Sequence, residues 1–231
     1  MQSLPWIIAH RGNASEATEN TIAAFESAIR IGADMIEMDI HRLADGELVV
    51  FHDDRIGKKE LKAIGYGELY EHTLKLHIEI PTFDQVLSVC AGRVRLVVEL
   101  KNDCASEVLQ VIRNARMGLE EYLLACFDSD ILLGLRKVHP GIKTALLTEN
   151  IGFREAQGRL DLVKPNFWAP DQATLDDVTL KSCEEYRIRL LPWTVNDPPT
   201  IRRFLSAKSV SGIITDRTRE ALEIRRELGM P

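Results

Sequence analysis

The fold predicted for this chain depends on two stretches, MIEMDI at residues 35–40 and RLVVELK at residues 95–101. In both stretches apolar residues alternate with charged ones, which is the period-two pattern of a β-strand with two different faces. One face, which includes Ile36 and Leu96, would pack against surrounding helices. The other face carries Glu37, Asp39 and Glu99, and these acids would converge if both strands belong to one barrel and point toward its axis.

Strand and helix patterns alternate along the rest of the chain. The predicted strands are Trp6–Ala9, Met35–Ile40, Leu48–Phe51, Arg95–Leu100, Tyr122–Cys126, Lys143–Leu147, Leu162–Lys164, Arg189–Trp193 and Gly212–Thr215. The predicted helices are Thr21–Ile31, Thr82–Val89, Ser106–Ala115, Ser129–Val138, Gly152–Gln157, Leu175–Tyr186, Pro199–Ala207 and Arg217–Leu228. Eight repeats, with Leu48–Phe51 as a hairpin partner of the second strand, predict an α/β fold of the TIM (β/α)8 barrel type. The alternative, an open doubly wound sheet, loses support because no G-x-G-x-x-G follows the first strand.

The chain has 231 residues, which is enough for one large core, so we expect a single domain over residues 1–231. Residues from about 54 to 80 form its least regular part, with three glycines and two histidines. We expect a short cap-like excursion from the barrel there. Phe167 and Trp168 follow a predicted strand and are expected in a loop that covers the barrel mouth.

The composition excludes several classes of partner. The net charge of −6 argues against a nucleic-acid binder and against a polybasic membrane anchor. The four cysteines form no C-x-x-C pair, which favours free thiols in a reducing compartment. The first residues lack a basic region followed by a long apolar run. We therefore expect a cytoplasmic protein without a signal peptide or stable membrane insertion.

Glu37, Asp39 and Glu99 form an oxygen-only ligand set. Hard divalent cations such as Mg²⁺ or Ca²⁺ prefer such ligands, and Mn²⁺ is a further candidate. We therefore expect one divalent cation at these acids. The alternative is a buried ionic network in which the acids pair with Arg11 and Lys101. It is less favourable, because two basic side chains leave the third buried charge uncompensated.

His10 and His52 each follow a short predicted strand. A lone histidine at such a place is more often structural, but two of them near an acid cluster can exchange protons at neutral pH. One can remove a proton while the other delivers one, which suits displacement at phosphorus. Arg11 and Lys101 would then hold the phosphate oxygens. His41 continues the acidic face of its strand and could reach the rim of the site.

A series of short motifs, each weak alone, occurs in one order along essentially the whole chain. They are His10-Arg11-Gly12, Glu19-Asn20-Thr21 with Ala24-Phe25, Gly32-Ala33-Asp34, Glu37-x-Asp39, Asp45-Gly46, His52-Asp53, Glu99-Leu100-Lys101, Trp193-Thr194-Val195-Asn196 and Gly212-Ile213-Ile214-Thr215-Asp216. With this ordered set, the chain resembles the glycerophosphodiester phosphodiesterase family.

The resemblance implies a TIM barrel that uses a metal ion to hydrolyse glycerophosphodiesters, which are small molecules, to glycerol 3-phosphate and an alcohol. By position it assigns the metal ligands Glu37, Asp39 and Glu99, the catalytic acid–base pair His10 and His52, the phosphate contacts Arg11 and Lys101, and Trp193 on the glycerol side of the pocket. A cyclic phosphate intermediate and direct attack by water both remain open. The stretch after His52 is shorter here than in the family, which bears on recognition of the alcohol.

Two other functions fit the same residues. The first is a phospholipase D-like hydrolysis of lysophospholipids, which would need an exposed apolar rim. The second is binding of a phosphate ligand without catalysis, since a fold alone does not fix a function. Pure binding would need the cation and a lysine but not two proton carriers, so it is the weakest of the three.

Overall fold

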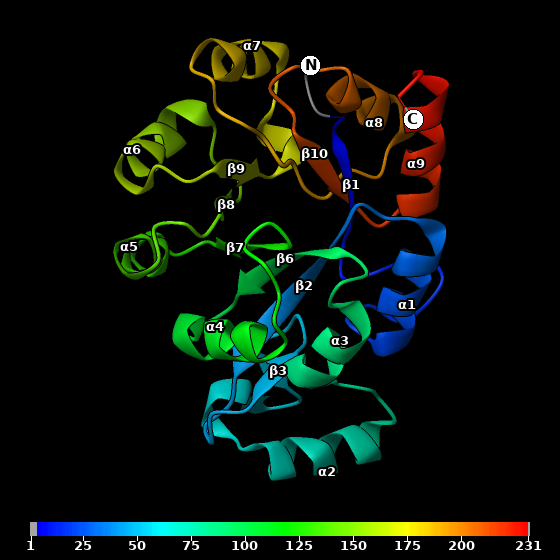
Figure 1. Cartoon of the computed structure of the whole chain (residues 1–231), viewed down its shortest axis with the longest axis vertical. Coiled ribbons are helices and arrows are strands. Elements are labelled where there is room, and N and C mark those ends of the chain that lie inside the picture. Colours follow the sequence, from blue (N-terminus) through cyan, green and yellow to red (C-terminus); the bar gives the residue numbers. More distant parts are fainter. Residues whose placement is uncertain (1–3, 231) are drawn as a thin grey trace.

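The computed structural model describes residues 4–230. Its parallel strands are β1 (Trp6–Ala9), β2 (Met35–Arg42), β6 (Arg95–Leu100), β7 (Tyr122–Cys126), β8 (Thr144–Thr148), β9 (Phe167–Pro170) and β10 (Gly212–Thr215). They pair in the order β10-β1-β2-β6-β7-β8-β9. Between β9 and β10, residues 189–193 close the ring, because Leu190 bridges to Trp168 on one side and to Val210 on the other. The TIM barrel predicted from the sequence is confirmed (Figure 1).

Helices surround the strands and create two apolar layers. The helices are α1 (Ile22–Ile31), α3 (Phe83–Cys90), α4 (Ala105–Asn114), α5 (Ser129–Val138), α6 (Phe153–Val163), α7 (Asp177–Glu185), α8 (Pro198–Leu205) and α9 (Thr218–Glu227), with the 3-10 turn η2 (Gln172–Thr174) between β9 and α7. The larger core lies between strands and helices and includes Ile36, Met38 and Leu96, as the alternation predicts. A smaller apolar cluster, with Val97 and Leu147, fills the barrel interior.

Local sequence signals set several helix ends. The hydroxyl of Thr21 accepts a hydrogen bond from the backbone N–H of Ala24 and caps α1, whose carboxyl end stops at Gly32 in the left-handed region. Thr82 and Gln85 form a reciprocal capping box that begins α3. These caps satisfy backbone groups that a helix leaves unpaired at its ends, so the helix boundaries follow from residues visible in the sequence.

The excursion after β3 is more regular than its sequence predicts. Strand β3 (Leu48–Val50) runs antiparallel to β2 and leads into the hairpin β4 (Arg55–Ile56) and β5 (Lys59–Glu60), the turn η1 (Leu61–Ala63) and helix α2 (Tyr66–Leu76). A separate apolar cluster, which includes Val49, Leu61 and Leu69, holds these elements together. Figure 1 shows α2 at one end of the molecule, beyond β3 and away from the centre of the barrel.

The predicted strand Leu162–Lys164 is wrong. Helix α6 continues through Val163, because Leu160 and Val163 lie on one helix face and both are buried, and Lys164 ends it in the left-handed region. The strand begins later, and Phe167 and Trp168 belong to it rather than to a loop. Phe167 faces the barrel interior, whereas Trp168 faces the helices and donates a hydrogen bond to the Thr148 hydroxyl.

Gly12 sets the path of the chain after β1. Its φ of +85° lies in the left-handed region, and a Cβ there would approach the carbonyl carbon and Cβ of Ala24 to 2.8 Å. The loop therefore packs directly on the first turns of α1, and the backbone N–H of Asn13 donates to the Ala24 carbonyl. A residue with a side chain at position 12 would move this loop, which carries two of the predicted site residues.

We expect Gly12→Ala to lower the free energy of unfolding by about 2–6 kcal/mol, because a strained backbone and an overpacked contact each contribute about 1–3 kcal/mol. Gly46→Ala is the matched control, since Gly46 has a φ of +91° but has nothing within 4 Å of the added Cβ. The control should show only the backbone part, about 1–3 kcal/mol. Urea unfolding of the two variants measures the difference, and equal losses would contradict the steric role of Ala24.

Candidate active site

The predicted site residues meet at the carboxyl ends of the strands. A cavity of about 290 Å³ is lined by all of them except Asp39, namely His10, Arg11, Glu37, His52, Glu99, Lys101 and Trp193. Asp39 is 1% exposed and contacts Arg11 and Lys101. Apolar residues of the barrel interior, including Val97, Leu147 and Ile214, form most of the remaining wall, to which Glu149 adds one acidic side chain. The excursion after His52 contributes none of the described residues that line it.

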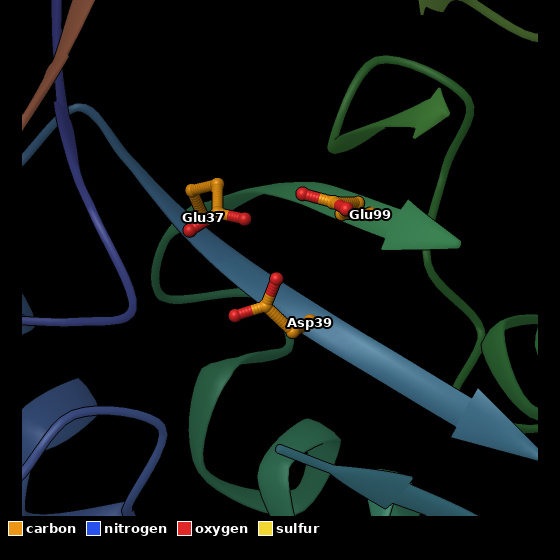
Figure 2. Close-up of side chains that lie close together, drawn as sticks. All are labelled: Glu37, Asp39 and Glu99. Carbon is orange, nitrogen blue, oxygen red and sulfur yellow. The ribbon is translucent and has the colours of Figure 1, made fainter. Parts of the chain in front are cut away.

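The three acids come from two neighbouring strands. Asp39 on β2 lies opposite Glu99 on β6 in the parallel register, and Glu37 lies two residues earlier on the same face of β2. One carboxylate oxygen from each residue lies within 4.8 Å of the others. Figure 2 shows the three carboxylates gathered above the paired strands. Their position on strands, rather than on loops, makes this spacing rigid.

Two basic side chains neutralise most of the acidic charge. The ammonium of Lys101 lies 2.9 Å from Asp39 Oδ1 and 2.7 Å from Glu99 Oε1, and Arg11 Nε lies 3.2 Å from Asp39 Oδ2. Burial alone would raise the pKa of Asp39, but the charges of Lys101 and Arg11 outweigh it and lower that pKa. The ionic network that the sequence offered as an alternative is therefore present around Asp39.

Glu37 is the acid that this network leaves least compensated. Its Oε2 accepts a hydrogen bond from the backbone N–H of Arg11 at 3.0 Å and lies 4.0 Å from His10 Nε2. Burial, followed by the charge of Asp39, raises the pKa of Glu37 to about 8. The raised pKa reflects the burial of Glu37 first and the neighbouring charge of Asp39 second, so the ionised form of Glu37 is the least stabilised of the three acids.

The cluster fits a divalent cation in chemistry and size. Oxygen ligands surround Mg²⁺ or Ca²⁺ at about 2.0–2.6 Å, so two ligands on opposite sides are about 4–5 Å apart. The spacing of Glu37, Asp39 and Glu99 lies within this range. Three carboxylates could hold one cation and leave other coordination positions for water or a substrate oxygen.

Each predicted histidine has one ring nitrogen bound to an aspartate. His10 Nδ1 lies 2.7 Å from Asp216 Oδ1, and His52 Nδ1 lies 2.8 Å from Asp53 Oδ1. The His10 side chain is 15% exposed, whereas that of His52 is 41% exposed. Burial would lower the pKa of His10, but the Asp216 hydrogen bond and the Glu37 charge outweigh it and raise that pKa.

Aromatic rings border the cavity on its apolar side. Trp193 donates a hydrogen bond from Nε1 to the carbonyl of Ala169 and meets Phe127 edge to face, with 5.8 Å between ring centroids. His41 does not reach the rim of the cavity: it is buried, and its Nε2 lies 3.4 Å from the backbone carbonyl of His52. Burial lowers the pKa of His41, so it supports the His52 loop as a neutral side chain.

Comparison with known proteins identifies the family. Residues 10–220 match the model of the glycerophosphoryl diester phosphodiesterase family. The chain belongs to this family. The YhdW protein of Bacillus subtilis is 30% identical, in an alignment that covers 91% of this chain and 94% of the relative. A glycerophosphodiester phosphodiesterase of Caldanaerobacter subterraneus subsp. tengcongensis is 27% identical, in an alignment that covers 96% of this chain and 98% of that relative.

A solved structure supports the same fold. The phosphodiesterase of Oleispira antarctica in complex with the product sn-glycerol-3-phosphate has a TM-score of 0.85 and 21% sequence identity, and the match covers 96% of this chain and 97% of that one. None of the helices in residues 4–230 is long and apolar enough to cross a membrane. The family assignment makes this chain a phosphoric diester hydrolase acting on glycerophosphodiesters.

Three polar residues that support the predicted site residues have no role assigned from the sequence. Asn20 is buried and donates a hydrogen bond from Nδ2 to Asp39 Oδ2 at 2.8 Å. Asp216 contacts His10, and Asn196 contacts Asp216. The sequence did contain a signal for Asp216. A closed barrel places the last strand beside the first, and Asp216 directly follows the last strand just as His10 directly follows the first.

The raised pKa of Glu37 predicts how the stability of the protein depends on pH. The Glu37 pKa of about 8 in the folded protein exceeds the ordinary 4.5. The resulting stability is therefore complete below about pH 4.5 and is lost as the pH rises through about 8. Thermal unfolding of the cation-free protein should show this decline.

Mg²⁺ should raise the melting temperature more at about pH 8 than at about pH 6, because at the lower pH it must first displace the Glu37 proton. Glu37→Gln should weaken both effects. An equal shift by Mg²⁺ at the two pH values would contradict the assignment of Glu37 as the protonated acid.

Proposed function

We propose that this chain hydrolyses glycerophosphodiesters to glycerol 3-phosphate and an alcohol, with a divalent cation held by Glu37, Asp39 and Glu99 and with His10 and His52 as proton carriers. The observation that carries the proposal is that both histidines line the same small cavity as Glu37 and Glu99 of the acid cluster. A ligand-binding protein would need no pair of proton carriers around its anion site.

Positive charge around the cavity suits a phosphodiester anion. Arg11 and Lys101 line the cavity and are already drawn to the acids. When bound, a divalent cation supplies charge that stabilises the negative charge developing on the phosphoryl oxygens. Lys101 would then be available to pair with a phosphate oxygen as a point charge, while Arg11 would offer a forked pair of donors.

The histidines divide the proton transfers at phosphorus. One ring nitrogen accepts the proton of the attacking hydroxyl or water, and the other ring donates a proton to the leaving alkoxide, so that no strongly basic oxygen is released. The bonds from Nδ1 to Asp216 and to Asp53 direct each Nε2 away from its aspartate. Each proton transfer of this kind is worth about 10²–10⁴ in rate.

The apolar wall suits the carbon skeleton of a small ester. Leu147, Trp193 and Ile214 border the cavity, so the glycerol carbons can lie against them while the phosphate faces the charged side. Apolar walls also exclude water, which strengthens the ionic contacts on the other side of the cavity. A volume of about 290 Å³ fits the reacting part of a glycerophosphodiester better than a lipid with an acyl chain.

Hydrolysis of lysophospholipids is the second candidate, and an adjoining hollow favours it. This hollow, of about 770 Å³, lies between α4 and α5, shares Glu99, Lys101 and Phe127 with the cavity, and has Leu109 and Leu135 in its lining. An acyl chain attached to the glycerol could leave the cavity past Phe127 and lie there.

The substrate class can be tested directly. We expect glycerol 3-phosphate to be released from glycerophosphocholine or glycerophosphoethanolamine in the presence of Mg²⁺ or Ca²⁺, and release to stop when a chelator removes the cation. An enzymatic assay of glycerol 3-phosphate measures both. Release of lysophosphatidic acid from a lysophospholipid alone would favour the second candidate, and no release from any substrate with any cation would overturn the proposal.

Histidine variants separate proton transfer from cation binding. His10→Ala and His52→Ala should each lower kcat by about 10²–10⁴ while the affinity for Mn²⁺ stays nearly unchanged. Glu37→Gln should instead weaken Mn²⁺ binding, because it removes a ligand charge. His72→Ala in α2 is the matched control, since His72 lies outside the described lining of the cavity, and its activity should equal that of the unmodified protein. A large loss of Mn²⁺ affinity in His52→Ala would reassign His52 as a ligand.

A further inference from the structure

The chain around Asp216 forms a continuous set of hydrogen bonds that ends on His10. Asp216 Oδ1 lies 2.7 Å from His10 Nδ1, and Asp216 Oδ2 accepts a hydrogen bond from Asn196 Nδ2, also at 2.7 Å. Asn196 Oδ1 in turn accepts from the backbone N–H of Asp216 at 2.9 Å and from the Thr215 hydroxyl at 3.1 Å. Each oxygen of the Asp216 carboxylate therefore has its own partner: Oδ1 contacts His10, and Oδ2 accepts from Asn196.

The barrel register places these residues together. Ala9 at the end of β1 is paired with Thr215 at the end of β10, so the next residue of each strand, His10 and Asp216, emerges at the same level. Asn196 follows residues 189–193, which lie on the other side of β10, and the backbone N–H of Val195 donates to the Ile214 carbonyl. The contact is therefore built into neighbouring strands and does not depend on a mobile loop.

We propose that Asp216, oriented by Asn196, is the positioning residue of His10 and fixes the ring with its proton on Nδ1 and with Nε2 facing Glu37. The proposal rests on the proposed function of His10 as a proton carrier. A carboxylate can only accept a hydrogen bond, so the neutral imidazole must place its proton on Nδ1. Nε2, which lies 4.0 Å from Glu37 Oε2, is then the nitrogen that exchanges a proton with the substrate.

The proton balance is the same in both directions of transfer. When Nε2 accepts a proton from a hydroxyl, the O–H bond breaks, an N–H bond forms, and the resulting imidazolium keeps its Nδ1–H on the Asp216 carboxylate. When Nε2 gives a proton away, the ring returns to the same neutral tautomer. Asp216 itself never takes up the proton. It acts through His10 and does not contact the reacting atoms.

The donor of Asn196 determines how an asparagine at position 216 would be oriented. Asn196 presents an N–H donor to the second oxygen of residue 216. If residue 216 becomes asparagine, its oxygen must face this donor, and its amide nitrogen must face His10 Nδ1. The ring would then accept a hydrogen bond at Nδ1 and carry its proton on Nε2, where it can no longer accept one from the substrate.

The test is an exchange of the two side chains. Asp216→Asn should lower kcat by about 10²–10⁴, as expected for the wrong tautomer, with little change in the affinity for Mn²⁺. In Asn196→Asp/Asp216→Asn, the carboxylate at position 196 accepts from the amide nitrogen at position 216, so the amide oxygen turns to His10. This double variant keeps the size and total charge of the pair, and kcat should recover at least in part.

Nitrogen-15 NMR of the imidazole ring reads the tautomer without any turnover. In the neutral form of His10, identified by its loss in His10→Ala, the proton should lie on Nδ1 in the unmodified protein, on Nε2 in Asp216→Asn, and again on Nδ1 in the double variant. A double variant no more active than Asp216→Asn, or a proton that stays on Nδ1 in Asp216→Asn, would overturn the proposal.

The two readouts separate this proposal from the proposed function. If the unmodified protein releases glycerol 3-phosphate from no glycerophosphodiester, the proposed function fails, while the order of tautomers among the three proteins still supports or overturns the role of Asp216. Thermal unfolding of all three proteins serves as the folding control, and a tautomer change in a protein that melts like the unmodified one cannot come from loss of structure.

Discussion

The mutual repulsion of three carboxylates on two neighbouring strands is the constraint that the surrounding side chains of the site must offset. Asp39 and Glu99 are paired in the β2–β6 register, and Glu37 shares their face. The ions cannot separate, because the backbone hydrogen bonds of the ladder hold their strands together. Lys101 and Arg11 converge on Asp39 as a result, and Asn20 adds a further donor to it. Burial and the charge of Asp39 raise the pKa of Glu37 to about 8, and a cation bound beside it would lower that pKa again.

The sequence allowed the strands that form this cluster to be predicted because their residues alternate between two environments. On β2 and β6, apolar side chains face the helices and acids face the axis, and a shift by one residue would bury the acids among helices. The same signal is absent at β9, where Phe167 points inward and Trp168 points outward. Both faces of this strand are apolar, so polar and apolar residues do not alternate along it. Helix α2 escaped prediction for a related reason, because only Leu69 and Thr73 in it are buried and its apolar pattern is weak.

The location of the candidate site could be predicted from the sequence because its residues lie at or near the ends of predicted strands. His10 and Lys101 directly follow β1 and β6, and His52 lies two residues after the end of β3. Strand ends are where barrel enzymes place polar side chains. The residues that hold them were harder to predict. Asp216 lies 206 positions from His10 in the chain, and their contact depends on the closure of the ring between β10 and β1, which alternation alone does not reveal. Sequence patterns therefore locate reactive groups better than the groups that orient them.

The two histidines differ in the rigidity of their support, and this difference follows from where each aspartate originates. Asp216 belongs to a neighbouring strand end and is itself bound by Asn196, so His10 is held by a partner fixed independently of its own loop. Asp53 adjoins His52 in the chain, and the His52 side chain is 41% exposed, so the partner of this ring belongs to the same loop as the ring itself. A buried, externally fixed ring suits the contact with Glu37 at the acid cluster. His52 lines the same cavity with a more exposed ring, so the two proposed proton carriers differ in exposure as well as in the origin of their aspartates.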